Sequence, residues 1–215
     1  MTNNKSEGQV LLEGAYGLTT PEDNVTFYRD FSESYDSDFA DALGFTLPAQ
    51  VAQAYMLSRI QGDVPIADLG CGTGLVADAL GDLAADIDGF DISVEMLEKA
   101  GLKGIYRDLF QIDLTKSVEG HEDVYMAVLC SGTFTHGHLG PDAIDMALLL
   151  GQTECLFVLS VNLIHYDTLG FGDKFMSLIE SDAIKDFHKE EVAIYANSDH
   201  DHSADRALIV SFRKT

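Results

Sequence analysis

The strongest constraint on the fold is a glycine-rich stretch that follows a short apolar run. Residues 66–74 read IADLGCGTG, so the apolar run leads directly into Gly70, Gly72 and Gly74. Glycine lets the backbone turn tightly and approach a ligand without a Cβ in the way. A helical pattern follows over residues 74–83, and a strand, a turn and a helix in this order begin a βαβ unit. The stretch therefore predicts an α/β fold with a ligand beside this turn.

The rest of the chain repeats this alternation of short apolar runs and helical patterns. The runs predict strands at 66–69, 87–91, 110–113, 124–130 and 156–163, and a closing hairpin at 191–196 and 208–212. Such alternation predicts one doubly wound, mostly parallel sheet, in which ligands bind at the carboxyl ends of the strands. We expect a single domain: a loose arm over 1–23, helices within 24–62 and a Rossmann-like core over 63–215.

The charge of the chain restricts its partners. It holds 36 acidic and 13 basic residues, for a net charge of −23. Nucleic acids and anionic membrane surfaces both require cations on the protein, so neither is expected as a partner. Three cysteines form no CxxC pair, and no apolar stretch approaches the roughly 20 residues of a membrane helix. We expect a cytoplasmic protein, monomeric or homodimeric.

The spacing of acids around the glycines favours a nucleoside without a pyrophosphate. A dinucleotide loop would place its third glycine at position 75, which is Leu75. Asp68 would repel phosphate and suits a ligand with an ammonium group. Asp91 ends the second strand, where a carboxylate can accept hydrogen bonds from both ribose hydroxyls. Ile92 can then cover the adenine, and Asp113 can accept from its amino group. Any one of these residues alone fits an ordinary turn or cap.

The ordered set resembles the cofactor loop of the class I S-adenosylmethionine-dependent methyltransferases. The resemblance implies a seven-stranded sheet in the order 3-2-1-4-5-7-6, with strand 7 antiparallel and helices on both faces. It implies S-adenosylmethionine as the cofactor; no metal is expected, because no set of metal ligands is found at a recognisable spacing. The residues that it assigns to the cofactor are Asp68, Gly70, Cys71, Gly72, Gly74, Asp91, Ile92, Asp113 and Leu114.

The N-terminal stretch FYRDFSESYD carries a second resemblance. It is similar to the Tyr-containing N-terminal helix of small methyltransferases related to the Williams–Beuren region methyltransferase. That helix covers the cofactor, so the resemblance makes the helices of 24–62 a lid and gives Tyr28 and Tyr35 contacts with the cofactor. The alternative is that both tyrosines are core aromatics of an amphipathic helix.

The loop after the fourth strand is expected to face the methyl acceptor. It lacks the Asn/Asp-Pro-Pro-Tyr pattern of adenine and glutamine N-methyltransferases and holds no Arg or Lys. This favours a small neutral or cationic acceptor, with a thiol or sulfide first and O- or N-methylation still open. Substrate contacts are expected from Ser131, Phe134, Thr135 and Tyr166, and catalytic roles from Thr133, His136 and His165. A structural histidine is the alternative for each imidazole.

Two other functions fit parts of the pattern. A nicotinamide oxidoreductase would use a related sheet, but Leu75 speaks against it. A non-catalytic subunit that keeps the cofactor site is the other alternative. The sequence Asp199-His200-Asp201-His202 contains metal-binding residue types but lacks further ligands at a recognisable spacing, so a solvated loop is the better interpretation.

Overall fold

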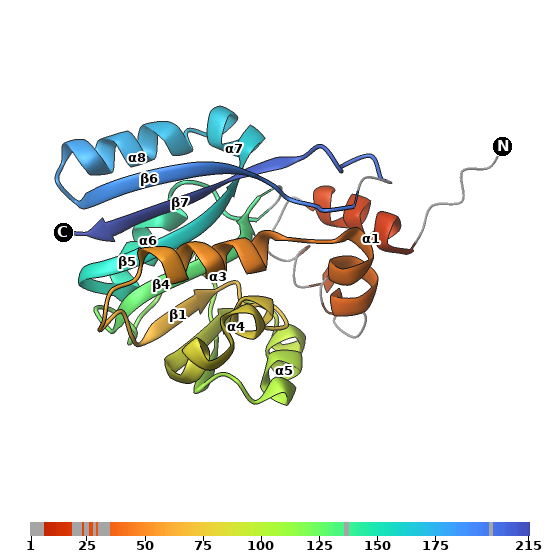
Figure 1. The fold of residues 1–215 in the computed structure, drawn as a ribbon, viewed down its shortest axis with the longest axis horizontal. Coiled ribbons are helices and arrows are strands. Elements are labelled where there is room, and N and C mark those ends of the chain that lie inside the picture. Colours follow the sequence, from red (N-terminus) through yellow and green to blue (C-terminus); the bar gives the residue numbers. More distant parts are fainter. Residues whose placement is uncertain are drawn as a thin grey trace.

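Seven strands form one sheet with the expected order. The computed structural model describes residues 7–18, 23, 26–27, 29, 35–135, 138–197 and 200–215. The order is β3-β2-β1-β4-β5-β7-β6, and β7 runs antiparallel to both of its neighbours (Figure 1). The strands are β1 (Ile66–Leu69), β2 (Ile87–Asp91), β3 (Asp108–Gln111), β4 (Tyr125–Phe134), β5 (Gly151–Asn162), β6 (Ile184–Ala193) and β7 (Arg206–Lys214). This confirms the doubly wound α/β sheet.

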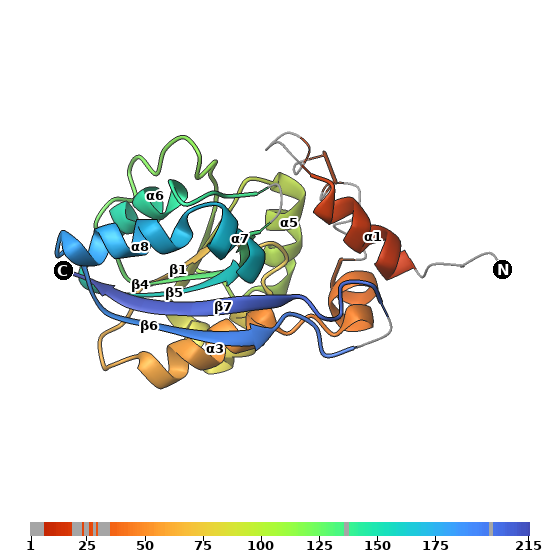
Figure 2. The ribbon, with the colours of Figure 1, turned by 90° about the horizontal axis from the view of Figure 1, so that it is seen from above.

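Helices cover both faces of the sheet, as expected. The helical elements are α1 (Glu7–Tyr16), η1 (Tyr35–Asp41), α3 (Leu47–Ser58), α4 (Leu75–Leu80), η2 (Gly81–Asp86), α5 (Val94–Lys103), α6 (Ala143–Leu150), α7 (Leu163–Thr168) and α8 (Phe171–Glu180). Figure 2 shows α3 on one side of the sheet and α6 and α8 on the other. Successive side chains of β4 point to opposite faces of the sheet. Ala127 and Leu129 pack on the face that α3 covers, and Val128 and Cys130 pack on the face that α6 and α8 cover.

The N-terminal part is more ordered than the expected loose arm. Within 1–23, residues 7–16 form α1, because Leu11, Leu12 and Ala15 are buried. Figure 1 shows α1 beyond the carboxyl ends of the parallel strands. Part of the helix predicted from residue 24 lies outside the described residues, and residues 35–41 form the short π-helical segment η1.

Helix α3 belongs to the core rather than to a lid. It begins beside Pro48, as the sequence predicts, and it packs across the sheet with Val51 and Tyr55 fully buried. The Tyr55 hydroxyl donates to the Asp63 carbonyl at 2.7 Å, which fixes the end of the helix against the approach to β1. The lid assignment of residues 24–62 therefore does not extend to α3.

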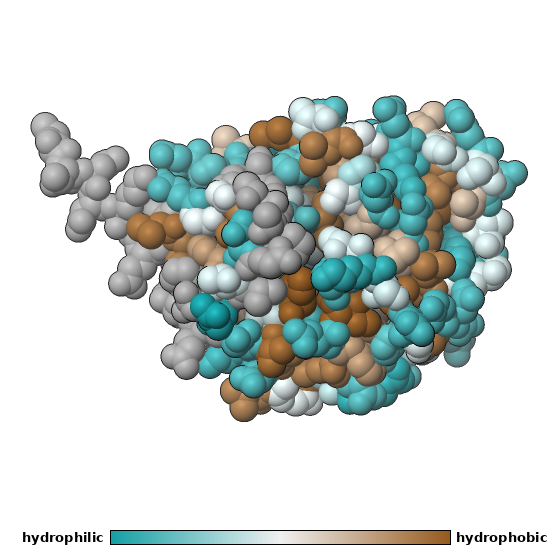
Figure 3. Space-filling view, turned by 180° about the vertical axis from the view of Figure 1, so that it is seen from behind, coloured by the Kyte–Doolittle hydropathy of each residue, from teal (hydrophilic) through white to brown (hydrophobic). Residues whose placement is uncertain are grey.

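The surface of the molecule carries many hydrophilic side chains (Figure 3). Hydrophilic residues cover much of the face shown in Figure 3, with smaller apolar areas between them. In the described part of the chain, none of the helices combines the length and the apolar character needed to cross a bilayer.

Candidate functional site

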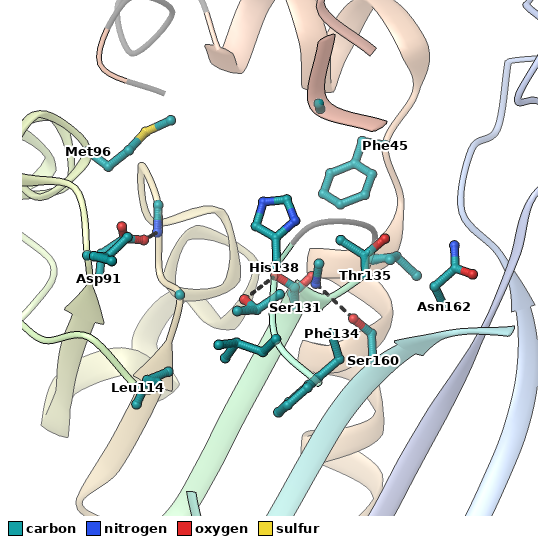
Figure 4. A pocket seen from close by; sticks show the side chains of 18 of the residues that line it. Phe45, Asp91, Met96, Leu114, Ser131, Phe134, Thr135, His138, Ser160 and Asn162 are labelled. Carbon is teal, nitrogen blue, oxygen red and sulfur yellow. Dashed lines mark hydrogen bonds between the residues drawn. The ribbon is translucent and has the colours of Figure 1, made fainter. Parts of the chain in front are cut away.

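A cavity opens at the carboxyl ends of four parallel strands. Its walls include Gly70 after β1, Asp91 at the end of β2, residues 131–134 of β4 with Thr135 directly after it, and Asn162 at the end of β5. Figure 4 shows Asp91, Met96 and Leu114 on one side and Thr135, Ser160 and Asn162 on the other. This is the edge at which ligands bind in open α/β sheets.

The glycine loop forms one wall in a conformation that side chains disfavour. Gly70, Gly72 and Gly74 have φ values of +62°, +54° and +96°. A Cβ on Gly70 would overlap the hydroxyl oxygen of Thr133, whereas a Cβ on Gly72 would meet no atom within 4 Å. Since Gly72 also lines the cavity, its bare backbone leaves room for a ligand to lie against it.

Asp91 is held ready to accept further hydrogen bonds. Its Oδ2 accepts from the Gly72 N–H at 2.8 Å, and its Oδ1 accepts from the Ser93 N–H at 2.9 Å. Burial raises the pKa of Asp91, although these N–H groups oppose the shift. A carboxylate has about four lone-pair sites, so two bonds leave acceptor capacity toward the cavity. The residue therefore fits the two hydroxyls of a ribose.

The cavity wall beside Asp91 is mostly apolar and suits a flat apolar group. Ile92, Leu114 and Met96 line it, and Asp113 lies beside them. Burial raises the pKa of Asp113, but the Lys116 ammonium at 2.8 Å and bonds from Thr115 outweigh it and leave the pKa below its ordinary value. Asp113 is thus an ionised acceptor whose oxygens already have local partners. Its contact with an adenine amino group stays a prediction.

Asp68 lies behind the cavity wall rather than in it. The residue is 0% exposed, and its Oδ2 accepts from the Tyr106 hydroxyl at 2.7 Å. Its Oδ1 has no hydrogen-bond partner among the described residues. Burial, with a smaller contribution from Asp91, raises its pKa to about 7, and the Tyr106 hydroxyl opposes the shift. Asp68 could therefore act on a ligand ammonium only through an intermediary.

Cys71 and Gly74, which the resemblance assigns to the cofactor, pack inside the protein and do not face the cavity. The Cys71 thiol is buried against Gly89, where a Cβ would lie 2.9 Å from its sulfur. Burial, Asp91 and Asp68 raise the pKa of the Cys71 thiol. Gly74 precedes α4 and packs on Tyr106. Neither lines the cavity, so both shape the loop that Gly70 and Gly72 present.

The expected acceptor residues divide into two groups. Ser131, Thr133, Phe134 and Thr135 line the cavity, together with Tyr35 of η1, and their roles toward the acceptor stay predictions. His165 and Tyr166 lie on α7, outside the cavity lining, because the chain turns into this helix directly after β5. The Tyr166 ring stacks on Phe175 instead. Tyr28 and His136 lie outside the described residues.

Several cavity residues were given no site role from the sequence. Met96 and His138 line it, as do Phe45, Ile194 and Tyr195 from distant segments and Ser160 and Asn162 near the end of β5. The Ser160 hydroxyl accepts from the Gly132 N–H at 2.8 Å. Ser160 and Asn162 could have been identified from the sequence, because they are the two polar residues in an otherwise apolar strand, CLFVLSVN, close to its carboxyl end.

Comparisons with known proteins agree with this arrangement. Residues 66–149 match the model of a methyltransferase domain. No match to the chain was found among curated proteins. A chain in the complex of the Haloferax volcanii Trm112 methyltransferase activator with a methyltransferase has a TM-score of 0.64 at 13% identity, covering 87% of this chain and 97% of that one.

Two further solved structures share the fold. A Thermotoga maritima S-adenosylmethionine-dependent methyltransferase, described as a candidate histamine N-methyltransferase, has a TM-score of 0.62 at 12% identity over 89% of this chain and 99% of that one. A structure concerned with conversion of a disulfide bond into a thioacetal group in echinomycin biosynthesis has a TM-score of 0.58 at 17% identity, covering 77% and 81%. Residues 66–149 thus match a methyltransferase domain, and the seven-stranded sheet has the fold of the class I S-adenosylmethionine-dependent methyltransferases.

Proposed function

We propose that the protein transfers a methyl group from S-adenosylmethionine to a small neutral or cationic molecule, with a thiol or sulfide as the first candidate acceptor. The observation that carries this proposal is the composition of the cavity. Among the described residues that line it, none is Lys or Arg, and its two carboxylates, Asp91 and Asp113, belong to the cofactor side. A carboxylate or phosphate on the acceptor would find no cation there.

The chain's residues would position the reactants and exclude water. S-Adenosylmethionine supplies a methyl carbon that a positive sulfonium already activates for displacement. Asp91 and the Gly70–Gly72 backbone would hold the cofactor, while Phe45 and Phe134 form apolar walls on the acceptor side. Alignment of the reacting groups is the largest contribution that such a site makes to an in-line transfer.

A sulfur acceptor makes small demands on the site. A thiol with a pKa near 8.5 is partly ionised at about pH 8, so it needs little help from a general base. His138 is the imidazole that lines the described cavity and is the base candidate for a hydroxyl or ammonium acceptor. The structural neighbour from echinomycin biosynthesis, with its disulfide-to-thioacetal conversion, supports sulfur chemistry, and the Thermotoga maritima neighbour keeps N-methylation as an alternative.

The test is formation of S-adenosylhomocysteine by the purified protein with four acceptor classes: thiols and sulfide, phenols, amines, and carboxylates. We expect turnover with the sulfur class, at a rate that rises with pH toward the thiol pKa. His138→Ala should leave that rate nearly unchanged. Turnover confined to carboxylates would contradict the proposal, and turnover confined to phenols or amines would replace sulfur as the acceptor atom.

A second candidate is a methyltransferase that requires an activating partner. The structural neighbour complexed with the Trm112 activator supports it. The expected signature is binding of S-adenosylhomocysteine by the protein alone, no turnover with any acceptor class, and turnover after a cell-extract fraction is added. Turnover by the purified protein alone would exclude this candidate.

A further inference from the structure

We infer that Asn162 selects the methyl acceptor by donating its side-chain amide N–H groups to an uncharged oxygen of that molecule. The acceptor would then be neutral and carry a carbonyl or hydroxyl oxygen near its reacting atom. This inference rests on the proposed function. It narrows the neutral or cationic acceptor proposed above to a neutral one and, among sulfur acceptors, favours a thiol that carries an oxygen over sulfide.

The orientation of the Asn162 amide is fixed by its backbone partners. The side chain is 4% exposed, and its Oδ1 accepts from the Ile164 N–H at 3.0 Å and the His165 N–H at 3.4 Å. Two N–H donors require the oxygen at that position, so the NH2 group must occupy the other one. In Figure 4 the oxygen of Asn162 is turned away from the other labelled side chains.

The NH2 group of Asn162 has no partner among the described residues. The residue lines the cavity, and its two hydrogen bonds both end on its oxygen. The amide nitrogen itself is not fully buried, so its donors reach the cavity, where water or a ligand oxygen can accept from them. A ligand oxygen in the cavity would satisfy them, whereas a ligand ammonium would face donors of the same polarity.

Two serines extend this donor surface. The Ser160 hydroxyl already accepts from Gly132, so its own O–H is free to donate. The Ser131 hydroxyl is buried and has no hydrogen-bond partner among the described residues. Asp91 lies on the opposite side of the cavity in Figure 4, so its charge does not offer a cation site beside Asn162. The acceptor end therefore presents hydroxyl and amide groups without a fixed charge.

Three isosteric probes test the charge preference directly: benzamide, benzoate and benzamidinium. We would measure their dissociation constants by calorimetry with saturating S-adenosylhomocysteine present. A salt concentration of about 0.5 M shortens the Debye length to about 4 Å and suppresses the field of the whole protein. We expect wild-type protein to bind benzamide about tenfold or more tightly than benzoate.

Asn162→Asp is the matched substitution. Its carboxylate still accepts from the two backbone N–H groups, but it replaces the donors with a negative charge. Benzamide binding should weaken and benzamidinium binding should strengthen, which changes the ratio of the two constants by about tenfold or more. Gln152→Glu adds the same charge near the other end of β5, where the side chain is exposed, and should leave the ratio unchanged.

A second variant keeps the test independent of the folding of Asn162→Asp. Asn162→Ser retains a capping oxygen and removes the amide, so benzamide binding should weaken while benzamidinium binding does not improve. Equal wild-type affinity for benzoate and benzamide, an unchanged probe ratio in a folded Asn162→Asp, or no binding of any probe would overturn the inference. These readouts need no turnover, so failure of methyl transfer to the acceptor panel is seen separately.

Discussion

The buried carboxyl group of Asp68 predicts a specific pH dependence of stability, which Asp68→Asn should remove. The residue is 0% exposed, Oδ1 has no partner among the described residues, and the pKa rises from an ordinary 3.8 to about 7. Between these values the folded state binds a proton that the unfolded state has lost. The free energy of unfolding therefore falls as pH rises through this window and is lowest above about pH 7.

The size of this effect follows from the pKa difference. Each unit corresponds to about 1.4 kcal/mol, so ionisation of Asp68 costs the folded state about 4 kcal/mol above pH 7. Asparagine keeps an oxygen for the Tyr106 hydroxyl and cannot ionise. The difference in unfolding free energy, Asp68→Asn minus wild type, should rise by about 4 kcal/mol from about pH 4 to pH 8. The amide group at the Oδ1 position adds a pH-independent cost of about 1–3 kcal/mol.

Urea unfolding of both proteins at a series of pH values provides the measurement. Tyr106→Phe is the companion variant, because it removes the hydroxyl that lowers the pKa of Asp68. Without this hydroxyl the pKa of Asp68 is higher, so the free energy of unfolding of Tyr106→Phe should continue to fall at pH values where that of wild type has already levelled off. A difference between Asp68→Asn and wild type that is constant across the pH range would refute the reasoning.

Three further predictions concern the glycine loop and its neighbours. Gly70→Ala should destabilise the fold by about 1–3 kcal/mol in urea unfolding, since its φ of +62° and the overlap with Thr133 both oppose a side chain. Unchanged stability would contradict the close approach of Gly70 to Thr133. Cys71 should react with iodoacetamide at pH 7 at least about tenfold more slowly than a free thiol, by mass spectrometry, because burial raises its pKa; a rate equal to that of free cysteine would be inconsistent with the buried position. Asp36→Ala should weaken S-adenosylhomocysteine binding about fivefold by calorimetry, since Asp36 ties η1 to the core through Lys103 at 2.9 Å; an unchanged affinity would show that η1 does not contribute to retention.

The central strands could be predicted because both of their faces are buried. β1 and β2 match their predicted bounds, and their buried residues form short apolar runs next to clear turn signals. The two edge strands were predicted less well. β3 lies two residues before its expected position, and β6 begins at Ile184 instead of residue 191. Their exposed, charged residues conceal the apolar alternation, as is common at sheet edges.

The cavity wall at the ends of β1 and β2 could be predicted because its residues follow one another along the chain. Gly70, Gly72 and Asp91 all line the cavity from the ends of two adjacent strands. The far wall could not be predicted, because Phe45 and Tyr195 meet through an isolated bridge between segments about 150 residues apart. A pattern of neighbouring residues in the sequence cannot predict a contact between segments so far apart. The short helix α7 was also missed, and it explains why His165 and Tyr166 lie away from the cavity.

Binding of S-adenosylhomocysteine to wild-type protein and to Asp91→Asn, measured by calorimetry, tests the central claim most directly. Asparagine preserves the size of the side chain and one acceptor oxygen, but it loses the charge that strengthens bonds from ribose hydroxyls. Binding by wild type, weakened about tenfold or more in an Asp91→Asn protein that circular dichroism shows to be folded, is the predicted result. No binding by wild type at about millimolar ligand, or equal affinity in the two proteins, would contradict the assignment of this cavity to the cofactor.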